Sequence, residues 1–427
     1  MIKSIILVGG PQKGTRFRPL SFNCPKPLFP IAGLPMIEHL IRASIEIPDM
    51  EEILLIGFYQ LDDSFTEFIQ SMTSKYQINI RYLQEYAPLG TAGGIYHFRD
   101  MICLGDPEVV FLFNGDVCGN FDLISMLEFH RSHSNQDKLI TILATEATRQ
   151  QSLEYGCIVK DKDTHEMLHY VEKPGSFIST TINCGVYILV PRIMNNLSNL
   201  FKEKHKNSRP VMIDDTSSTP LESLSLENDV LKTLTDSRKI LIHQQSENFW
   251  WTPIKTPSSA IYANRNYLCN YRKYNPELLY SNSDGKPEII GDVYIDPTAV
   301  IDPTAKIGPN VSISEGVRIG AGVRIKESIV LKNVIIKNHS LIMYSVLGWN
   351  CSIGHWSRVE GTPCDPNPDR AFSKMENFPL FDCEGKLNPL ITVLGRNVRV
   401  SPEIIILNSV VLPYKQIDRS YKNEIIL

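Results

Sequence analysis

The feature that most constrains the fold is a six-residue repeat in the C-terminal third of the chain. From Ile295 onward an aliphatic residue recurs at every sixth position, and a second small or aliphatic residue follows four positions after each. The first set is Ile295, Ile301, Ile307, Ile313, Ile319, Ile325 and Leu331, and the second is Ala299, Ala305, Val311, Val317, Val323, Ile329 and Ile335. Consecutive hexads of this kind predict a left-handed parallel β-helix, in which each hexad forms one side of a triangular coil and its aliphatic residues stack into a continuous core.

One segment interrupts this repeat. The pattern returns at Leu347 and again at Leu394, but residues 360–389 break it for 30 residues. A loop of this length inside a compact domain is more often functional or disordered than a plain connection. It carries acidic and aromatic side chains, and exposed aromatic side chains suit contact with another protein. We therefore predict a hexapeptide-repeat domain over residues 287–427 with an inserted loop, and our hypothesis is that this loop contacts a partner.

The N-terminal part of the chain alternates short apolar segments with amphipathic ones. The apolar segments are rich in β-forming residues, and between the first two lies "PMIEHLIRASIEI", in which Met36, Leu40 and Ile41 have helical spacing. Alternating strands and helices imply βαβ units and a mixed, mostly parallel sheet. We predict a Rossmann-like α/β domain over residues 1–258 and a helical linker over residues 259–286.

Two further features of this α/β domain bear on its function. Ligands of such sheets bind at the carboxyl ends of the strands, where Gly9, Gly10 and Asp116 fall. A polar segment at residues 202–229 interrupts the pattern, and we interpret it as a surface insertion that adds no chemistry.

Composition excludes several classes of function. The chain has 427 residues, long enough for two or three domains, and its formal net charge of -4 offers no electrostatic case for nucleic acid or an anionic membrane. No apolar run approaches the roughly 20 residues of a membrane span. The nine cysteines include no CxxC pair, which favours reduced thiols over disulfides or a zinc site. We expect a cytoplasmic protein.

The stretch "LVGGPQKGTRFRPL" near the N-terminus reads as a strand that runs into a glycine-rich loop. It is not a Walker A motif, because Thr15 and Arg16 stand where that motif needs Lys and then Ser or Thr. Nor does it fit the dinucleotide fingerprint. Backbone N–H groups of such a loop can hold phosphate oxygens, and Arg16, Arg18 and Lys26 can neutralise a polyphosphate. A glycine turn with solvated basic residues remains the alternative from this stretch alone.

The order of the motifs along the chain then points to one family. The chain resembles the nucleoside-diphosphate-sugar pyrophosphorylases, especially the GDP-mannose pyrophosphorylases, over nearly its whole length. The segments that carry the resemblance are "GTRFRPL…PKPL" (14–28), "PLGTAGG" (88–94), "FNGDV" (113–117), "VEKP" (171–174), "INCGVY" (182–187) and the hexapeptide repeats. The resemblance implies a nucleotidyltransferase-like N-terminal domain that binds a nucleotide sugar.

The resemblance also implies roles for particular residues. It assigns Gly9, Gly10, Thr15 and Arg16 to the triphosphate, and Gly90, Thr91 and Gly93 to the base and ribose. Asp116 matches the carboxylate that binds Mg²⁺, and Glu172, Lys173 and Asn183 match contacts to the sugar phosphate. The full set of expected GDP-mannose-binding positions is Gly9, Gly10, Thr15, Arg16, Lys26, Glu85, Gly90, Thr91, Gly93, Asp116, Gly156, Glu172, Lys173, Asn183 and Pro253.

Several of these residues also have purely structural interpretations. Gly156 and Gly185 can simply allow close backbone packing, and Glu172 with Lys173 can form a surface ion pair worth under about 1 kcal/mol. Cys184 reads as a small core residue rather than a nucleophile, since no histidine lies nearby in the sequence to activate it.

Two departures separate the chain from the catalytic members of the family. Active members carry a compact Gly-Gly-x-Gly-Thr-Arg loop, whereas here Pro11-Gln12-Lys13 fill the single gap. Active members also bind the metal with a second aspartate in a Trp-x-Asp-[Ile/Val]-Gly motif, and in "WTPIKT" Pro253 stands at that position. Phosphoryl transfer of this kind depends on positioning and on metal-assisted charge neutralisation. Arg16, Lys26 and Asp116 are therefore expected to be vestiges of a catalytic site, with Mg²⁺ possible at Asp116 but not required.

Both departures and the long insertion resemble the regulatory, alpha-type members of the family. That resemblance implies a subunit that binds GDP-mannose, assembles as homo- and hetero-oligomers through the β-helix with a catalytic beta subunit, and mediates feedback inhibition. Two other hypotheses stay open: an active mannose-1-phosphate guanylyltransferase, and a structural scaffold that binds no ligand.

Overall fold

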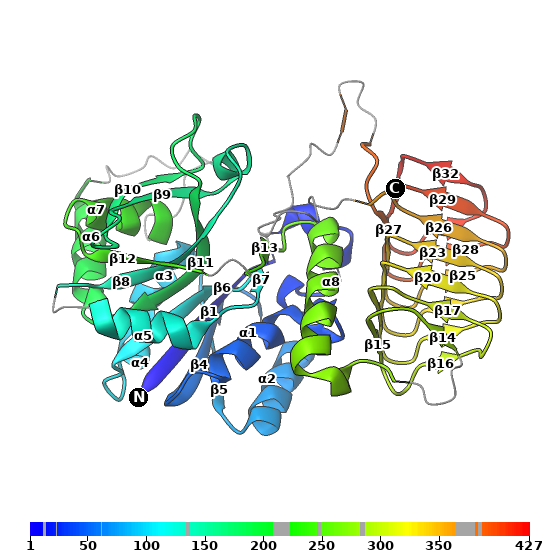
Figure 1. The fold of residues 1–427 in the computed structure, drawn as a ribbon, viewed down its shortest axis with the longest axis horizontal. Coiled ribbons are helices and arrows are strands. Elements are labelled where there is room, and N and C mark those ends of the chain that lie inside the picture. The colour runs from blue at the N-terminus through cyan, green and yellow to red at the C-terminus, as the bar shows by residue number, and fades with distance from the viewer. Residues whose placement is uncertain are drawn as a thin grey trace. The chain divides into compact units, whose positions relative to one another are not determined.

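The computed structural model describes residues 1–11, 14–22, 24–60, 62–133, 137–207, 223–245, 249–281, 287–363, 381–382 and 387–427. The chain divides into two compact units. The first comprises residues 1–13, 37–117 and 121–251, and the second comprises residues 14–36, 118–120 and 252–427. Figure 1 shows the helices and strands of both units.

In the described part of the first unit, nine strands form one sheet. Its main path runs β10 (Met167–Glu172), β9 (Gly156–Lys160), β11 (Thr181–Leu189), β6 (Val109–Asn114), β1 (Ile2–Gly9), β4 (Met50–Gly57) and β5 (Asn79–Gln84). Two further strands, β8 (Ile140–Glu146) and β12 (Ile240–Gln244), extend from β11. The pairs β1–β4, β1–β6, β4–β5 and β8–β12 are parallel, while β11 is antiparallel to β6, β8 and β9. The predicted mixed sheet is confirmed.

Helices flank this sheet (Figure 1). They are α1 (Met36–Ile45), α2 (Asp63–Tyr76), α3 (Gly90–His97), α4 (Arg99–Ile102), α5 (Leu123–His133), α6 (Ile193–Asn207) and α7 (Lys232–Thr235). Helix α1 lies where the spacing of its apolar residues predicts it, and Met36, Leu40 and Ile41 are fully buried. The strand sequences are continuous apolar runs, because helices cover both faces of the sheet and bury the side chains on each face.

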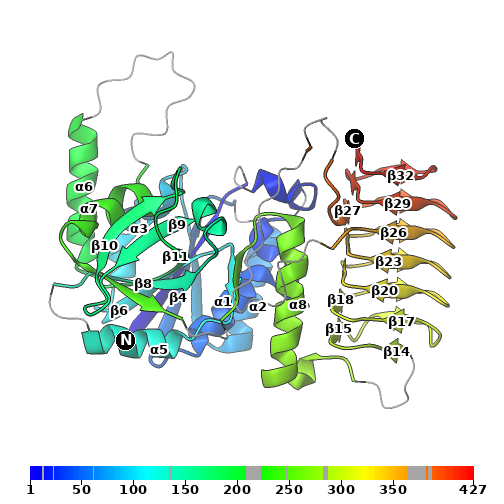
Figure 2. The ribbon, with the colours of Figure 1, turned by 45° about the horizontal axis from the view of Figure 1, so that its top comes forward.

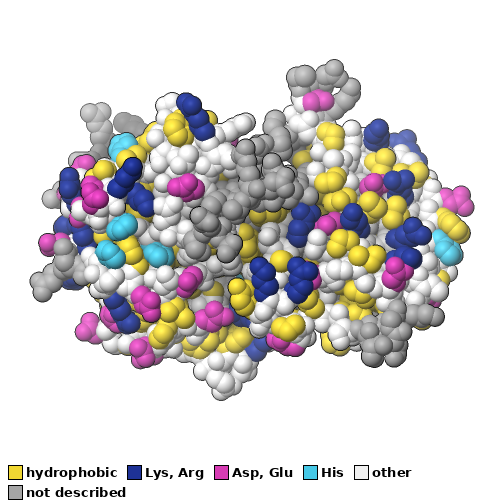
Figure 3. Space-filling view, viewed as in Figure 1, with side chains coloured by type: hydrophobic (Ala, Val, Ile, Leu, Met, Phe, Trp, Pro, Cys, Tyr) yellow, Lys and Arg dark blue, Asp and Glu magenta, His cyan; other side chains and the backbone are white. Residues whose placement is uncertain are grey.

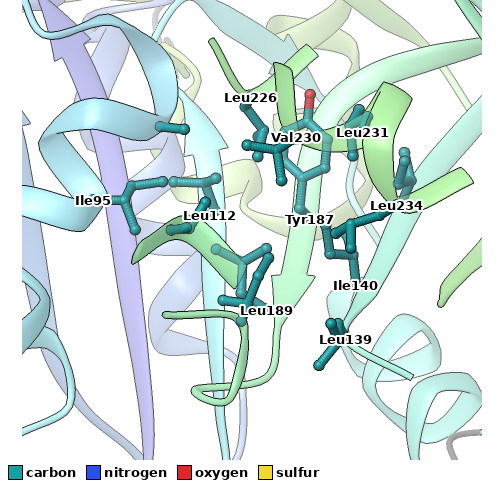
Figure 4. Packing of buried hydrophobic residues seen from close by; sticks show 14 of the residues in the cluster. Ile95, Leu112, Leu139, Ile140, Tyr187, Leu189, Leu226, Val230, Leu231 and Leu234 are labelled. Atoms are coloured by element: carbon teal, nitrogen blue, oxygen red, sulfur yellow. The ribbon is translucent and has the colours of Figure 1, made fainter. Parts of the chain in front are cut away.

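One part of the segment interpreted as a surface insertion belongs to the core instead. Leu224, Leu226, Val230 and Leu231 are each at most 1% exposed, and all four belong to the main hydrophobic cluster of this unit. Figure 4 shows Leu226, Val230 and Leu231 gathered around the ring of Tyr187. Most of these residues form a short π-helical turn, η5 (Leu226–Leu231). The interpretation of residues 202–229 as peripheral is therefore wrong for the described residues 223–229.

The second unit contains three ladders of parallel strands that stack as successive coils (Figure 2). The first ladder is β14 (Glu288–Ile289), β17 (Lys306–Ile307), β20 (Arg324–Lys326), β23 (Leu341–Met343), β26 (Arg358–Glu360), β29 (Ile405–Leu407) and β32 (Tyr421–Lys422). The second is β15 (Val293–Ile295), β18 (Val311–Ile313), β21 (Ile329–Val330), β24 (Ser345–Leu347), β27 (Thr392–Leu394), β30 (Val410–Val411) and β33 (Ile425–Ile426). The third is β16 (Val300–Ile301), β19 (Arg318–Ile319), β22 (Ile335–Ile336), β25 (Ser352–Ile353), β28 (Arg399–Val400) and β31 (Gln416–Ile417). These parallel strands in three sheets confirm the predicted β-helix.

The repeat changes phase at several corners that the strict six-residue count misses, and the first of them lies between Ile325 and Val330. Ile313 pairs with Val330, 17 residues later, because the corner between Ile325 and Val330 is one residue shorter than a full hexad. Glu327 forms this corner with a positive φ of 48°. The side chains that directly follow this corner are therefore shifted by one position relative to the strict count. Ile335, predicted to point inward, is 42% exposed, and its neighbour Ile336 is 1% exposed.

The second ladder is covered on its outer side by other parts of the same unit. Ile329, Val346 and Val393 belong to this ladder but not to the interior cluster, yet each is at most 2% exposed. Helix α8 (Pro257–Tyr274) lies along it, with Asn264 Nδ2 donating to Asn310 O at 3.3 Å and Arg265 paired with Glu327 at 2.9 Å.

The segment 14–36 packs against the same unit. The backbone N–H of Ala32 donates to Asn264 Oδ1 at 2.9 Å, and the rings of Phe29 and Trp349 meet edge to face at 6.1 Å between centroids. Helix α8 and this segment together explain why outward-facing aliphatic residues are buried.

The interruption of the repeat lies at one corner of the β-helix, between β26 and β27. Its two ends are tied together, because Thr362 N–H donates to Leu390 O at 3.0 Å and Thr392 Oγ1 donates to Glu360 O at 2.6 Å. Most of the segment that carries the partner-contact hypothesis, residues 364–380 and 383–386, lies outside the described residues.

Within the described residues, no helix is both long and apolar enough to cross a membrane. On the face that Figure 3 shows, positive and negative side chains are interspersed among hydrophobic ones.

Candidate functional site

Two of the three expected sugar-phosphate residues, Asn183 and Glu172, meet in one partly buried hydrogen-bond network. Asn183 Nδ2 donates to Tyr187 Oη at 2.8 Å and lies 3.5 Å from Tyr170 Oη. The Tyr170 hydroxyl donates to Glu172 Oε2 at 2.6 Å. The Asn183 side chain is oriented because its Oδ1 accepts the backbone N–H of Gly185 at 2.9 Å. The structure thus brings together Asn183 and Glu172, which are 11 positions apart in the sequence.

The two tyrosines of this network stay protonated at any ordinary pH. Burial raises the pKa of Tyr170 well above its usual value, and the neighbouring Tyr187 and Glu172 raise it further. Burial likewise raises the pKa of the fully buried Tyr187, and the Glu227 carboxylate adds to the effect. A neutral phenol remains a hydrogen-bond donor. The network therefore presents Glu172 as an oriented acceptor.

Gly156 serves this network by leaving room for it. Gly156 and Glu172 are paired residues of the antiparallel strands β9 and β10. A Cβ atom on Gly156 would lie 2.2 Å from Tyr170 Oη and 2.8 Å from Glu172 Oε2. The packing interpretation of this glycine and the binding interpretation are therefore compatible, since the packed neighbours are themselves expected site residues.

The expected base and ribose residues lie at the start of helix α3. The first backbone N–H groups of a helix have no partner within it, and here Leu224 O accepts from Ala92 N at 2.9 Å and from Gly93 N at 3.2 Å. Gly90 has a positive φ of 81°, and a Cβ atom there would lie 2.5 Å from Leu224 O. Because the glycines of "GTAGG" have no side chains, the backbone around Leu224 can lie close to the start of α3.

Thr91 connects this helix to a carboxylate that the motif analysis does not include. Its Oγ1 donates to Glu227 Oε2 at 2.7 Å and accepts the backbone N–H of Leu226 at 2.8 Å. Glu227 also accepts from Ser225 Oγ at 3.1 Å. Sequence reasoning missed Glu227 because a polar segment without family motifs reads as a surface insertion.

Tyr170 and Tyr187 were also missed, although a signal for each was present. Tyr170 lies two residues before Glu172 on a strand, so both side chains point to the same face. Tyr187 closes the quoted motif "INCGVY". The alternation of side chains between the two faces of a strand was the signal that could have identified these tyrosines.

Three other expected residues of the first unit lie at strand ends. Gly9 ends β1 with a positive φ of 72°, and Asp116, which is half-buried, lies between β6 and β7 (Val117–Gly119). Gly10 approaches Phe58 so closely that a Cβ atom would lie 3.0 Å from Phe58 Cβ.

The side chains of Glu85 and Lys173 differ in their exposure to solvent. Glu85 follows β5 and is 8% exposed, and its carboxylate oxygen lies 2.3 Å from where a Cβ atom on Gly94 would be. Lys173 follows Glu172 with a positive φ of 47°, and it is exposed. Only Lys173 of these two has its side chain in solvent.

The remaining expected residues belong to the second unit. Thr15 and Arg16 form a short 3-10 turn and are exposed, and Lys26 is buried with its Cδ atom 3.3 Å from the Cβ position of Gly14. Pro253 ends the short strand β13 (Trp251–Pro253), which pairs with β7. The insertion in the phosphate loop includes residues 12 and 13, which lie outside the described residues.

The "WTPIKT" stretch is nonetheless anchored as a structured element. Trp251 Nε1 donates to Cys184 O at 2.8 Å, and the ring of Trp251 meets that of Tyr155 at 5.3 Å between centroids. Cys184 is fully buried, which agrees with its interpretation as a core residue.

The expected metal site depends on Asp116 and on the residue at position 253. Mg²⁺ prefers carboxylate and water oxygens, and the side chain of Pro253 has no oxygen to add to that of Asp116. Among the described residues, no three His, Cys, Asp or Glu side chains are grouped so that they could hold a metal ion.

Comparison with known proteins gives a consistent result over the whole chain. Residues 3–268 match the family described as nucleotidyl transferase, and residues 289–426 match a domain described as the GMPPB C-terminal domain. The chain is 51% identical to "Mannose-1-phosphate guanyltransferase alpha-A" of Xenopus laevis and 51% identical to "Mannose-1-phosphate guanylyltransferase regulatory subunit alpha" of Homo sapiens. It is 50% identical to "Mannose-1-phosphate guanylyltransferase regulatory subunit alpha-A" of Danio rerio. Each alignment covers 100% of this chain and 100% of the relative.

Proposed function

Since the chain belongs to the nucleotidyl transferase family, and within it to the mannose-1-phosphate guanylyltransferase regulatory subunits alpha, we propose that it binds GDP-mannose as a regulatory subunit with little or no turnover of its own. The ligand then serves as a signal of product level, and the chain passes that signal to a catalytic partner subunit as feedback inhibition.

The observation that carries this proposal is a contrast between two parts of the expected site. The Asn183–Tyr170–Glu172 network is partly buried, and hydrogen bonds orient its side chains. At the position expected for the second metal-binding aspartate stands Pro253, which has no side-chain oxygen. Ligand recognition is therefore supported by the first part, while metal-assisted phosphoryl transfer lacks support from the second.

Assembly is the second part of the proposal. A parallel β-helix exposes backbone edges and outer faces that readily pair with another protein. The relatives that are named regulatory subunits imply a catalytic partner, and we propose that residues 287–427 provide the contacts for homo- and hetero-oligomers.

Two alternatives make different predictions. An active mannose-1-phosphate guanylyltransferase would need water or another side chain to complete the metal site at Asp116. A structural scaffold would bind no nucleotide sugar.

The test uses the purified chain alone, in calorimetry with GDP-mannose and in a pyrophosphate-release assay with GTP, mannose 1-phosphate and Mg²⁺. We expect binding of GDP-mannose with or without Mg²⁺, and no release of pyrophosphate above background. Turnover on the order of 1–10³ s⁻¹, as in ordinary enzymes, would support the active alternative. Absence of binding would support the scaffold.

A control locates the binding. Asn183→Leu removes the amide that donates to Tyr187 at 2.8 Å and accepts from Gly185, at similar side-chain volume. We expect this variant to lose most of its affinity for GDP-mannose while its circular dichroism spectrum stays that of the folded chain.

A further inference from the structure

One corner of the β-helix presents a pair of exposed aromatic rings. Trp356 is 63% exposed, and its ring stacks on that of the exposed His339 with 4.3 Å between centroids. Both residues have a positive φ, 60° for Trp356 and 61° for His339, and they occupy the same corner of successive coils, between the third ladder and the first. The backbone N–H of Trp356 donates to Asn338 O at 3.0 Å, which ties the two corners together. A rigid scaffold therefore holds the two rings at the surface.

The other tryptophans of the chain are packed away from solvent. Trp250 and Trp251 are at most 9% exposed, and the ring of Trp349 meets that of Phe29 at 6.1 Å between centroids. Exposed tryptophan rings on rigid elements are typical anchors of protein interfaces, because they supply a large contact area at a small cost in conformational entropy. The position of Trp356 thus indicates contact with another molecule.

The coils around these rings are strongly basic. We call residues 318–326, 335–343, 352–360 and 399–407 the corner surface; in four successive coils they run from the third ladder through this corner to the first ladder. The corner surface has six basic residues against two acidic ones, whereas the whole chain has a formal net charge of -4. The basic residues are Arg318, Arg324, Lys326, Lys337, Arg358 and Arg399. Of these, only Arg358 forms an ion pair within the described residues, with Glu360.

Exposed apolar side chains lie among these basic ones. Ile335 is 42% exposed and Ile405 is 41% exposed, and they pair with Ser352 and Arg358 of the neighbouring strands. On the face that Figure 3 shows, several Lys and Arg side chains lie over the first ladder. An apolar, aromatic centre with a polar rim is the usual anatomy of a protein interface. A corner of a β-helix is convex, whereas small molecules bind in concave pockets, so the corner surface suits a partner protein better than a small ligand.

We propose that the corner surface binds an acidic segment of a partner protein. An apolar side chain of that segment packs on the Trp356 ring, and its carboxylates pair with the arginines on either side. Arg324 and Arg358 are separated by the strand of Leu341, so their Cα atoms are about 10 Å apart. Two carboxylates of one extended segment span this distance, since such a chain advances about 3.3 Å per residue. The inference depends neither on nucleotide-sugar binding nor on the proposed oligomers.

Nucleic acid is the other class of polyanion that aromatic rings and arginines recognise. The observations favour an acidic protein segment, because a nucleic acid extends its charge well beyond four coils and the chain as a whole is negative. The experiment therefore includes a single-stranded oligonucleotide as a separate arm.

The probe is a short synthetic peptide in which glutamate alternates with leucine around a central proline, and its control carries glutamine at every glutamate position. Fluorescence anisotropy of the labelled peptides with the full-length chain measures binding. Acrylamide quenching of tryptophan fluorescence reports on Trp356, the most exposed tryptophan. We expect the acidic peptide to bind, to lose affinity as the salt concentration rises, and to protect Trp356 from acrylamide. The glutamine peptide should bind at least about tenfold more weakly.

Two variants locate the contact. Trp356→Ala removes the aromatic anchor, and Arg324→Gln combined with Arg399→Gln removes two of the charges. Each variant should weaken binding of the acidic peptide by about tenfold or more, and the double variant should also flatten the salt dependence. All three side chains are exposed, so denaturation of the variants should show the stability of the wild type.

Tyr414→Ala is the matched control. Tyr414 is also 63% exposed and also has a positive φ, 64°, at a corner of the same β-helix, but it lies between the second ladder and the third. This substitution removes an equally exposed aromatic ring outside the corner surface, and it should leave the affinity for the peptide unchanged.

Three results would overturn the assignment. The first is that the chain binds neither peptide, or binds both equally well. The second is that Tyr414→Ala weakens binding as much as Trp356→Ala does, which would show a general effect of exposed rings. The third is that the oligonucleotide binds more tightly than the acidic peptide at the same salt concentration and depends on Trp356, because the corner surface would then be a nucleic-acid site.

Discussion

At the scale of single residues, the candidate site is a set of small positions that make room for polar neighbours. Gly156 and Gly90 are the clearest cases, since a Cβ atom would meet Tyr170 Oη at 2.2 Å in one and Leu224 O at 2.5 Å in the other. Each glycine is needed because of an atom that lies far away in the sequence. Substitutions at such positions should therefore affect the network and not only the backbone.

Gly156→Ala should lower both stability and affinity for GDP-mannose. The added methyl group must displace Tyr170 or Glu172, and overpacking of this kind costs about 1–3 kcal/mol. Gly175→Ala is the control, because nothing lies within 4 Å of its Cβ position, and its stability should change by less than about 1 kcal/mol. Chemical denaturation and calorimetry of both variants test this, and equal effects would contradict it.

His130 should make the fold sensitive to acid. Burial lowers its pKa to about 4, whereas the unfolded chain binds the proton near pH 6.5. Above pH 6.5 neither state is protonated, and as the pH falls from 6.5 towards 4 only the unfolded state gains the proton. The free energy of unfolding should therefore fall in this window, by up to about 1.4 kcal/mol per pH unit for this residue.

His130→Gln isolates that contribution, because glutamine can keep a hydrogen bond to Thr141 Oγ1, which lies 2.7 Å from His130 Nδ1. Denaturation between pH 7 and pH 4 should show a shallower loss of stability in this variant than in the wild type. The exposed His355→Gln is the control for the loss of a histidine. His243, whose pKa burial also lowers to about 4, adds to the wild-type slope and remains in both variants.

At the scale of elements, the β-helix tolerates irregular corners while its interior stays continuous. The corner at Glu327 is one residue short, and the one between β26 and β27 carries the long insertion, yet Leu347 and Leu394 are both fully buried and paired. Coil stacking depends on the strand residues of neighbouring coils, so a corner can change length without breaking a ladder.

Substitutions at two adjacent isoleucines test whether the short corner at Glu327 decides which of them points into the β-helix. Ile336→Ala removes a side chain that is 1% exposed and should cost about 2–5 kcal/mol of unfolding free energy. Ile335→Ala, at a side chain 42% exposed, should cost less than about 1 kcal/mol. Urea denaturation of the two variants compares them directly. If Ile335→Ala cost more stability than Ile336→Ala, the side chains here would follow the strict six-residue count, and the shifted phase would be wrong.

At the scale of the whole molecule, the two compact units do not follow the order of the sequence. Residues 14–36 are embedded in the second unit through Phe29 and Ala32, although they lie near the N-terminus. The expected phosphate residues Thr15, Arg16 and Lys26 are therefore held by the unit that contains the β-helix.

The purified chain should form oligomers at micromolar concentration, alone and with a catalytic paralogue. The β-helix presents outer faces and terminal coils suited to pairing. Light scattering of the chain, with and without the paralogue and with and without GDP-mannose, measures this. A monomer under all four conditions would contradict the proposed assembly.

The sequence by itself determined the architecture and the family. The six-residue period specifies a β-helix because each aliphatic position must face the same interior, and that requirement is local and repeated. The order of the motifs specified the nucleotidyl transferase family, and Gly9, Gly10 and Asp116 lie at or just beyond the carboxyl ends of strands as expected.

Only the tertiary structure decided which polar residues meet and which segments are buried. Thr91 and Glu227 come from distant parts of the chain, and no local pattern records their hydrogen bond. Residues 223–229 look polar because alternate side chains face outward, yet the residues between them fill the core. The phase after Glu327 depends on one positive-φ corner, which a count of sixes cannot detect. Local periodicity encodes burial along one element, whereas contacts between elements arise only when the elements pack.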